Sequence, residues 1–93
     1  MSEQRESAPN KNLTITRAAV TERIMARLDG RVDAGALAAW AFDRFYAEEL
    51  GEETYEPGAE PAIADALDAL MFSDDPGFQL DEEELRALIA QLG

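Results

Sequence analysis

Apolar residues recur along this chain at three- and four-residue intervals, which is the spacing of one face of an α-helix. Three segments share one start signal, in which a capping residue separates an apolar N′ residue from an apolar residue at N4. The three sets, each in the order N′, cap and N4, are Ile15-Thr16-Val20, Val32-Asp33-Leu37 and Leu80-Asp81-Leu85. This pattern predicts helices that begin after residues 16, 33 and 81.

Each of these starts is followed by an apolar stripe, and the first two by a glycine at which the helix can end. Gly30 and Gly51 end the first and second helices, and Glu84 completes a capping box in the last one. We expect Phe42 and Tyr46 at the edge of the second stripe, where they either join the core or face a partner. The residues predicted to face inward are Val20, Ile24 and Leu28; Leu37, Trp40, Ala41 and Phe45; and Leu85, Leu88, Ile89 and Leu92.

A fourth helix is predicted between the second and the last one. Pro61 fits its first helical position, and apolar residues then recur from Ile63 to Phe72. Turn-forming residues separate the segments, and no strand pattern or internal repeat competes with the helical one. The sequence therefore predicts an all-α fold, a small antiparallel four-helix bundle over residues 13–93, preceded by a disordered tail at residues 1–12.

The composition excludes several classes of function. The chain has no cysteine and no histidine, so it lacks thiol chemistry, His-based acid–base catalysis and most zinc sites. Loops that begin at Asp65 or Asp74 place Leu67 or Pro76 where an EF-hand needs an oxygen ligand. No apolar run approaches the roughly 20 residues that span a bilayer. We expect a cytoplasmic protein that is not an enzyme and that needs no cofactor or metal.

The net charge of −12 is unevenly distributed along the chain. Between Phe45 and Leu85 there are fourteen acidic residues and no lysine or arginine. Such a surface repels nucleic acid and anionic membranes and attracts basic proteins. The alternative is that the acidic surface only keeps the protein soluble. The arginines Arg23, Arg27 and Arg31, in and after the first helix, are expected to pair with the chain's own acids, for instance Glu22 or Asp29, or to reach across to the second or the last helix.

The candidate partner-binding residues are carboxylates of this acidic stretch and two aromatic residues within its loops. Aromatic side chains surrounded by charge are common in protein-binding hot spots. We expect the carboxylates to lie on a common side of the bundle and to produce one negative potential. The candidate residues are Glu48, Glu49, Glu52, Glu53, Tyr55, Glu56, Glu60, Asp65, Asp68, Asp74, Asp75 and Phe78.

Over about residues 13–92 the chain resembles the colicin-D-type (self-protective colicin-like) immunity proteins of bacteria. The resemblance lies in the opening segment 15–33, the aromatic second helix, the stretch Leu67-Asp68-Ala69-Leu70-Met71-Phe72-Ser73-Asp74-Asp75-Pro76, and the closing segment 80–92. It implies a four-helix bundle that blocks the tRNase domain of a toxin, with carboxylates in place of RNA phosphates. It also implies that Asp74 and Asp75 make the inhibitory contacts.

Three functional hypotheses follow from the sequence. The first is an immunity-type inhibitor that blocks a basic nuclease toxin by mimicking nucleic-acid phosphates. The second is an adaptor or regulatory subunit that docks on a larger assembly through Tyr55, Phe78 and neighbouring apolar surface. The third is a nucleic-acid mimic directed at a DNA-binding protein. None of them involves direct binding of nucleic acid or membrane, and the sequence leaves the oligomeric state open.

Overall fold

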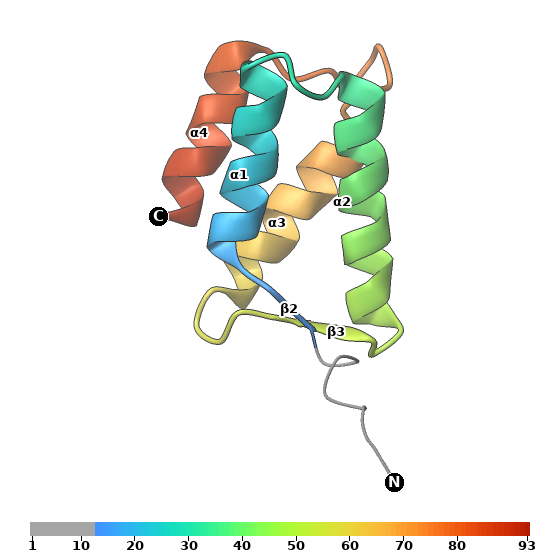
Figure 1. Ribbon diagram of the computed structural model, residues 1–93, viewed down its shortest axis with the longest axis vertical. Coiled ribbons are helices and arrows are strands. Elements are labelled where there is room, and N and C mark those ends of the chain that lie inside the picture. The colour runs from blue at the N-terminus through green and yellow to red at the C-terminus, as the bar shows by residue number, and fades with distance from the viewer. Residues whose placement is uncertain (1–12) are drawn as a thin grey trace, which may run out of the picture.

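A computed structural model describes residues 13–93 of the chain (Figure 1). The predicted disordered tail, residues 1–12, lies outside the described residues. The elements are, in chain order, β2 (Leu13–Ile15), α1 (Arg17–Leu28), α2 (Ala34–Glu49), β3 (Glu53–Tyr55), α3 (Glu60–Met71) and α4 (Glu82–Leu92). The described fold is therefore mostly helical, with four helices and one short pair of strands.

The three predicted helix starts are confirmed, because each capping side chain accepts a backbone hydrogen bond. Thr16 Oγ1 accepts from the N–H of Ala19 at 3.0 Å, and Asp33 Oδ1 accepts from the N–H of Ala36 at 2.8 Å. In α4 the side chain of Asp81 accepts from the N–H of Glu84, whose own carboxylate accepts from the N–H of Asp81. These bonds satisfy N–H groups that the first turn of a helix leaves without a partner.

The start of α3 differs slightly from the prediction. Glu60 is already helical, so Pro61 occupies the second helical position rather than the first. Proline is tolerated there because the first turn has no internal acceptor for its missing N–H. Ala59 precedes the helix without a side-chain cap, and the carboxylate of Glu60 instead accepts from the N–H of Gly58 at 2.9 Å.

The all-α prediction needs a correction, because the described chain contains a two-stranded parallel sheet. Strand β2 pairs with β3 so that Leu13, Thr14 and Ile15 lie opposite Glu53, Thr54 and Tyr55. Three residues are too few to show the alternation of a strand in the sequence. The two partners are also about forty positions apart, so local pattern cannot reveal the pairing.

The core is built from all four helices and the end of β2. Trp40 and Phe45, which were predicted to be internal, are half-buried against this core, whereas Phe42 and Tyr46 are exposed. The buried cluster comprises Ile15, Val20, Ile24, Leu37, Ala41, Ala59, Ile63, Ala66, Leu67, Leu70, Leu85, Leu88 and Leu92.

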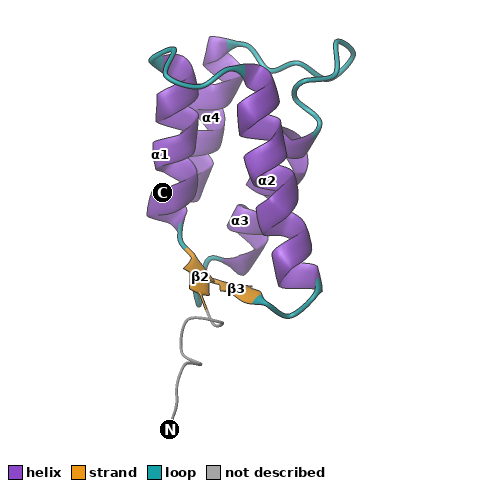
Figure 2. Cartoon of the chain, turned by 45° about the vertical axis from the view of Figure 1, so that its right-hand side comes forward, coloured by secondary structure: helices purple, strands orange, loops and turns teal. Residues whose placement is uncertain are grey.

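Successive helices alternate in direction along the long axis of the molecule, and α3 is inclined to the other three (Figure 1). Both views place β2 and β3 at one end, together with the end of α2 and the start of α3 (Figures 1 and 2). The connections α1–α2 and α3–α4 lie at the opposite end. The fold thus has a strand end and a loop end, with α3 running between them.

The packing of β2 gives a first testable prediction. Ile15 is 3% exposed and belongs to the buried cluster, whereas Leu13 on the same strand is 55% exposed. We expect Ile15→Ala to lower the free energy of unfolding by about 2–5 kcal/mol, because it leaves a cavity in the core. Leu13→Ala is the matched control and should change it by about 0.5 kcal/mol or less. Urea denaturation measures both, and equal effects would show that β2 does not anchor the core.

Candidate functional site

The structure divides the predicted acidic cluster between the two ends of the molecule. The carboxylates of residues 48–60 lie at the strand end, while Asp74 and Asp75 belong to the α3–α4 connection at the loop end (Figure 1). The twelve residues of α3, about 18 Å long at 1.5 Å per residue, separate the two groups. Because this exceeds a Debye length of about 8 Å, the two groups do not act as one compact charge.

A row of exposed residues on α3 connects the two groups. Asp65, Asp68 and Phe72 follow Pro61 at helical spacing and share its solvent-facing side, opposite the buried residues of the helix. Glu60 stands at the start of this row and Asp75 lies beyond its end. We call Glu60, Asp65, Asp68, Asp74 and Asp75 the α3 acidic row. The predicted negative surface is therefore elongated rather than compact.

Two of the ten candidate carboxylates are neutralised by arginines. The guanidinium of Arg17, at the start of α1, donates to both carboxylate oxygens of Glu56, with Nη2–Oε2 at 2.9 Å. These hydrogen bonds and the backbone N–H of Arg17 hold the pKa of Glu56 below its usual value. Glu53 is 8% exposed, and its carboxylate accepts a hydrogen bond from Nη1 of Arg44 on α2. Glu53 and Glu56 therefore already have cationic partners within the chain.

The other eight candidate carboxylates have no arginine or lysine within salt-bridge distance in residues 13–93. Glu48 is half-buried and the remaining seven are exposed. Glu60 and Asp75 also accept backbone hydrogen bonds, from Gly58 and Gly77 respectively, which orients their side chains. The eight are Glu48, Glu49, Glu52, Glu60, Asp65, Asp68, Asp74 and Asp75.

The two candidate aromatic residues have different environments. Tyr55 is half-buried and packs against the core, where burial, and next the charges of Glu48 and Glu49, raise its pKa to about 12. Phe78 is 65% exposed, and its ring centroid lies 6.3 Å from that of Phe72, which is 51% exposed. An exposed aromatic pair with carboxylates nearby in sequence fits a protein-binding hot spot better than Tyr55 does.

Sequence reasoning missed Phe72, because the inner stripe of its helix was expected to extend to that residue. The spacing of the apolar residues in α3 nevertheless showed that Phe72 lies outside the inner stripe. The buried residues of α3 are Ile63, Ala66, Leu67 and Leu70, and Phe72 lies on the opposite face, together with Asp65 and Asp68. A strict count of the 3.6-residue period would have placed its ring outside the core.

Most arginines of α1, and Arg31 in the connection that follows it, contact other parts of the chain, as predicted. Arg31 pairs with Glu22 and Asp29, at 3.3 and 3.4 Å. Arg23 lies over the ring of Trp40, 5.5 Å from its centroid, which is a cation–π contact between α1 and α2. Arg27 has no carboxylate within salt-bridge distance in the described part of the chain, and its side chain lines a pocket instead.

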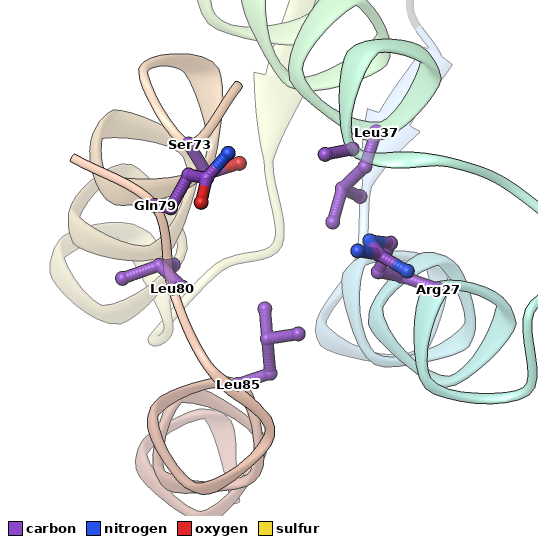
Figure 3. A pocket seen from close by; sticks show the side chains of 7 residues that line it. Arg27, Leu37, Ser73, Gln79, Leu80 and Leu85 are labelled. Carbon is purple, nitrogen blue, oxygen red and sulfur yellow. The ribbon is translucent and has the colours of Figure 1, made fainter. Parts of the chain in front are cut away.

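That pocket is small and has a mixed polar and apolar lining. Figure 3 shows Arg27 and Leu37 on one side of it, Ser73, Gln79 and Leu80 on the other, and Leu85 from α4 between them. Its volume is about 90 Å³, well below the roughly 300–1,000 Å³ typical of ligand sites. The hydroxyl of Ser73 donates to the carbonyl of Leu70 at 2.7 Å, so this hydroxyl is engaged in closing α3. The pocket brings together no pair of groups suited to acid–base or nucleophilic catalysis.

Residues 13–93 hold no group of three or more histidine, cysteine, aspartate or glutamate side chains arranged to bind a metal ion. Over the same residues, none of the helices combines the length and the apolar character needed to cross a bilayer.

Comparison of the chain with protein-family models, with curated proteins and with solved structures finds no match. The interpretation of this surface therefore depends on its own geometry and charge.

The Arg44–Glu53 pair gives a prediction about stability. Arg44→Met leaves the carboxylate of Glu53 buried without its cation, and we expect a loss of about 1–3 kcal/mol in the free energy of unfolding. The double variant Arg44→Met/Glu53→Met should recover most of this loss, because it removes both charges. Arg86→Met is the control, since the Arg86–Glu82 pair is exposed and contributes at most about 1 kcal/mol. Urea denaturation tests all three; a double variant no more stable than Arg44→Met would contradict the explanation.

The raised pKa of Tyr55 gives a prediction about pH. The folded protein keeps the phenolic proton up to about pH 12, whereas an ordinary tyrosine releases it near pH 10.0. The resulting stabilisation is complete below about pH 10 and is lost as the pH rises to about 12. Ultraviolet titration should show a phenolate transition near pH 12 that Tyr55→Phe removes. Glu48→Gln/Glu49→Gln should lower this pKa without restoring it to 10, because burial remains its largest cause. A Tyr55 transition near pH 10 would refute the assignment.

Proposed function

We propose that this chain is a non-catalytic binding protein that docks onto a basic protein through carboxylates of residues 48–75. One observation carries the proposal. The chain has no cation between Phe45 and Leu85, and eight of the ten candidate carboxylates have no cationic partner within residues 13–93. Unpaired like charges oppose compaction of the chain, so a partner that neutralises them gains favourable electrostatic energy.

A nuclease toxin is the partner class that this surface fits best. A nuclease binds phosphates through a basic groove, and much of its affinity comes from charge neutralisation. The α3 acidic row spreads unpaired carboxylates from the first residue of α3 to the connection beyond its end, and an elongated negative surface of this kind suits a basic groove. This agrees with the resemblance to the colicin-D-type immunity proteins, in which Asp74 and Asp75 would make the inhibitory contacts. The proposal includes an antiparallel four-helix bundle as scaffold and the cytoplasm as its location.

The test has two steps: this protein is used as bait to capture its partner from the source cell at low salt, and a captured nuclease is then assayed for inhibition. Capture of no basic nuclease would refute the inhibitor proposal. The purified nuclease domain is titrated with this protein while RNA cleavage is measured. We expect stoichiometric inhibition at low salt and a steep loss of affinity as salt rises. Asp74→Asn/Asp75→Asn should weaken binding about tenfold or more. Asparagine retains an oxygen for the N–H of Gly77, so the turn is preserved.

The matched control is Glu22→Gln/Asp29→Asn, which removes the same amount of charge from residues of α1 and its C-cap. This variant should inhibit nearly as well as the wild type. If both double variants lose affinity equally, only net charge matters and the acidic row is not the binding site. If the wild-type protein does not inhibit the nuclease at low salt, the inhibitor proposal is wrong.

The exposed pair Phe72–Phe78 favours a second candidate function, an adaptor that docks apolar surface onto a larger assembly. Binding of this kind persists at high salt, because the burial of apolar surface depends little on ionic screening. It should be lost in Phe78→Ala and retained in Asp74→Asn/Asp75→Asn. The same titration therefore separates the two candidates.

A further inference from the structure

Helix α2 is apolar on the side that faces solvent as well as on the side that faces the core. Gly35, Ala39, Phe42 and Tyr46 follow one another at intervals of four, three and four residues, so they share one face of the helix. All four are exposed, with Phe42 at 49% and Tyr46 at 45%, and their two rings lie 4.6 Å apart between centroids. We call these four residues the α2 outer face. Large exposed aromatic side chains at helical spacing are typical of a surface that another helix covers.

A groove runs beside this face, between α2 and the end of α3. Its volume is about 260 Å³. Its lining combines small residues of α2 with the apolar side chains of Phe42 and Met71, and Asp43 and Asp74 are its charged residues. Small residues allow two helices to approach closely, because they do not separate the backbones. The complete lining is Gly35, Ala38, Ala39, Phe42, Asp43, Met71 and Asp74.

The charge of the groove identifies the chemistry of its occupant. Asp43 and Asp74 have no cation within salt-bridge distance in residues 13–93, and the lining contains no lysine or arginine. A ligand that fits must therefore bury apolar side chains against Phe42, Tyr46 and Met71 and place cations beside the two carboxylates. The α2 outer face spans about three helical turns, which matches anchor side chains at i, i+3 or i+4, and i+7 of a docked helix.

We propose that the α2 outer face and its groove bind a basic amphipathic helix of the partner protein. The apolar side of that helix packs on Phe42 and Tyr46, and lysine or arginine residues at its edge pair with Asp43 and Asp74. This inference rests on the proposed function for the basic character of the partner, and it adds the shape and the apolar anchor of the contact. Asp74 belongs both to the groove beside the α2 outer face and to the α3 acidic row, so the proposed binding site for the helix is continuous with the acidic row.

A second copy of this chain fits the groove poorly. Each chain carries a net charge of −12, so self-association through this face brings two strongly negative surfaces together. A symmetric contact would also place the unpaired Asp43 and Asp74 of the two copies near one another, and like charges in close contact are destabilising. The two unpaired carboxylates of the groove are instead complementary to a positively charged helix.

The test uses two synthetic peptides of identical composition. The first is an amphipathic helix of about four turns with leucine at i, i+3, i+4 and i+7 and arginine at the flanks. In the second, the same residues are scrambled so that no apolar face forms. We expect the first peptide to bind more tightly and to shift the backbone amide resonances of Phe42, Asp43, Tyr46 and Asp74. Phe42→Ala/Tyr46→Ala should weaken its binding about tenfold or more and leave the binding of the scrambled peptide unchanged.

Both substituted side chains are exposed, so this variant should fold, and circular dichroism checks it. Leu13→Ala/Met25→Ala, which removes two exposed apolar side chains elsewhere, is the control and should bind like the wild type. If the two peptides bind equally well, or if the Phe42→Ala/Tyr46→Ala variant keeps its affinity, the helix site is wrong but the basic-partner proposal stands. If neither peptide binds at low salt, the helix site and the basic-partner proposal are both wrong. If sedimentation shows a dimer that this variant abolishes, the face belongs to a second copy and the inference is overturned.

Discussion

The position of β3 depends on two arginine–glutamate pairs, one at each end of the strand. Glu53 begins the strand and binds Arg44 of α2, while Glu56 follows its last residue and binds Arg17 of α1. Between them the strand pairs with β2, which leads directly into α1. The segment between α2 and α3 has no cation of its own, so arginines from two different helices pair with two of its three glutamates. These two contacts tie the segment that leads into α3 to α1 and α2.

Once those two glutamates are neutralised, the remaining carboxylates of residues 48–75 are left without internal partners. The core excludes them, because burying an unpaired charge costs far more than exposing it. They therefore lie on the surface of α3 and at both ends of the molecule. Repulsion among them lowers the stability of the isolated protein and makes association with a cationic surface more favourable. The excess of unpaired carboxylates thus limits the stability of the free protein and favours binding to a basic partner.

The acidic row and the α2 outer face lie on neighbouring helices and meet at Asp74. Helices α2 and α3 share the most extensive packing in the described fold, so the relative position of the two surfaces is well determined. Carboxylates mainly increase the rate of association and select the sign of the partner's charge, whereas buried aromatic side chains slow dissociation. A partner that combines a basic groove with an amphipathic helix would use both surfaces together.

The sequence by itself determined the starts of α1, α2 and α4 and the inner stripes of α1, α4 and, apart from Phe72, α3, because caps and helical periodicity are local. It also established the excess of carboxylates. Leu37 and Ala41 are internal, as predicted, but the apolar pattern of α2 left the side of Phe42 and Tyr46 open, and only the packing of the folded chain placed them outside the core. The β2–β3 pairing and the ion pairs of Glu53 and Glu56 with arginines also required the tertiary structure. These contacts join residues far apart in the chain, and no local pattern records which distant residue will be the neighbour.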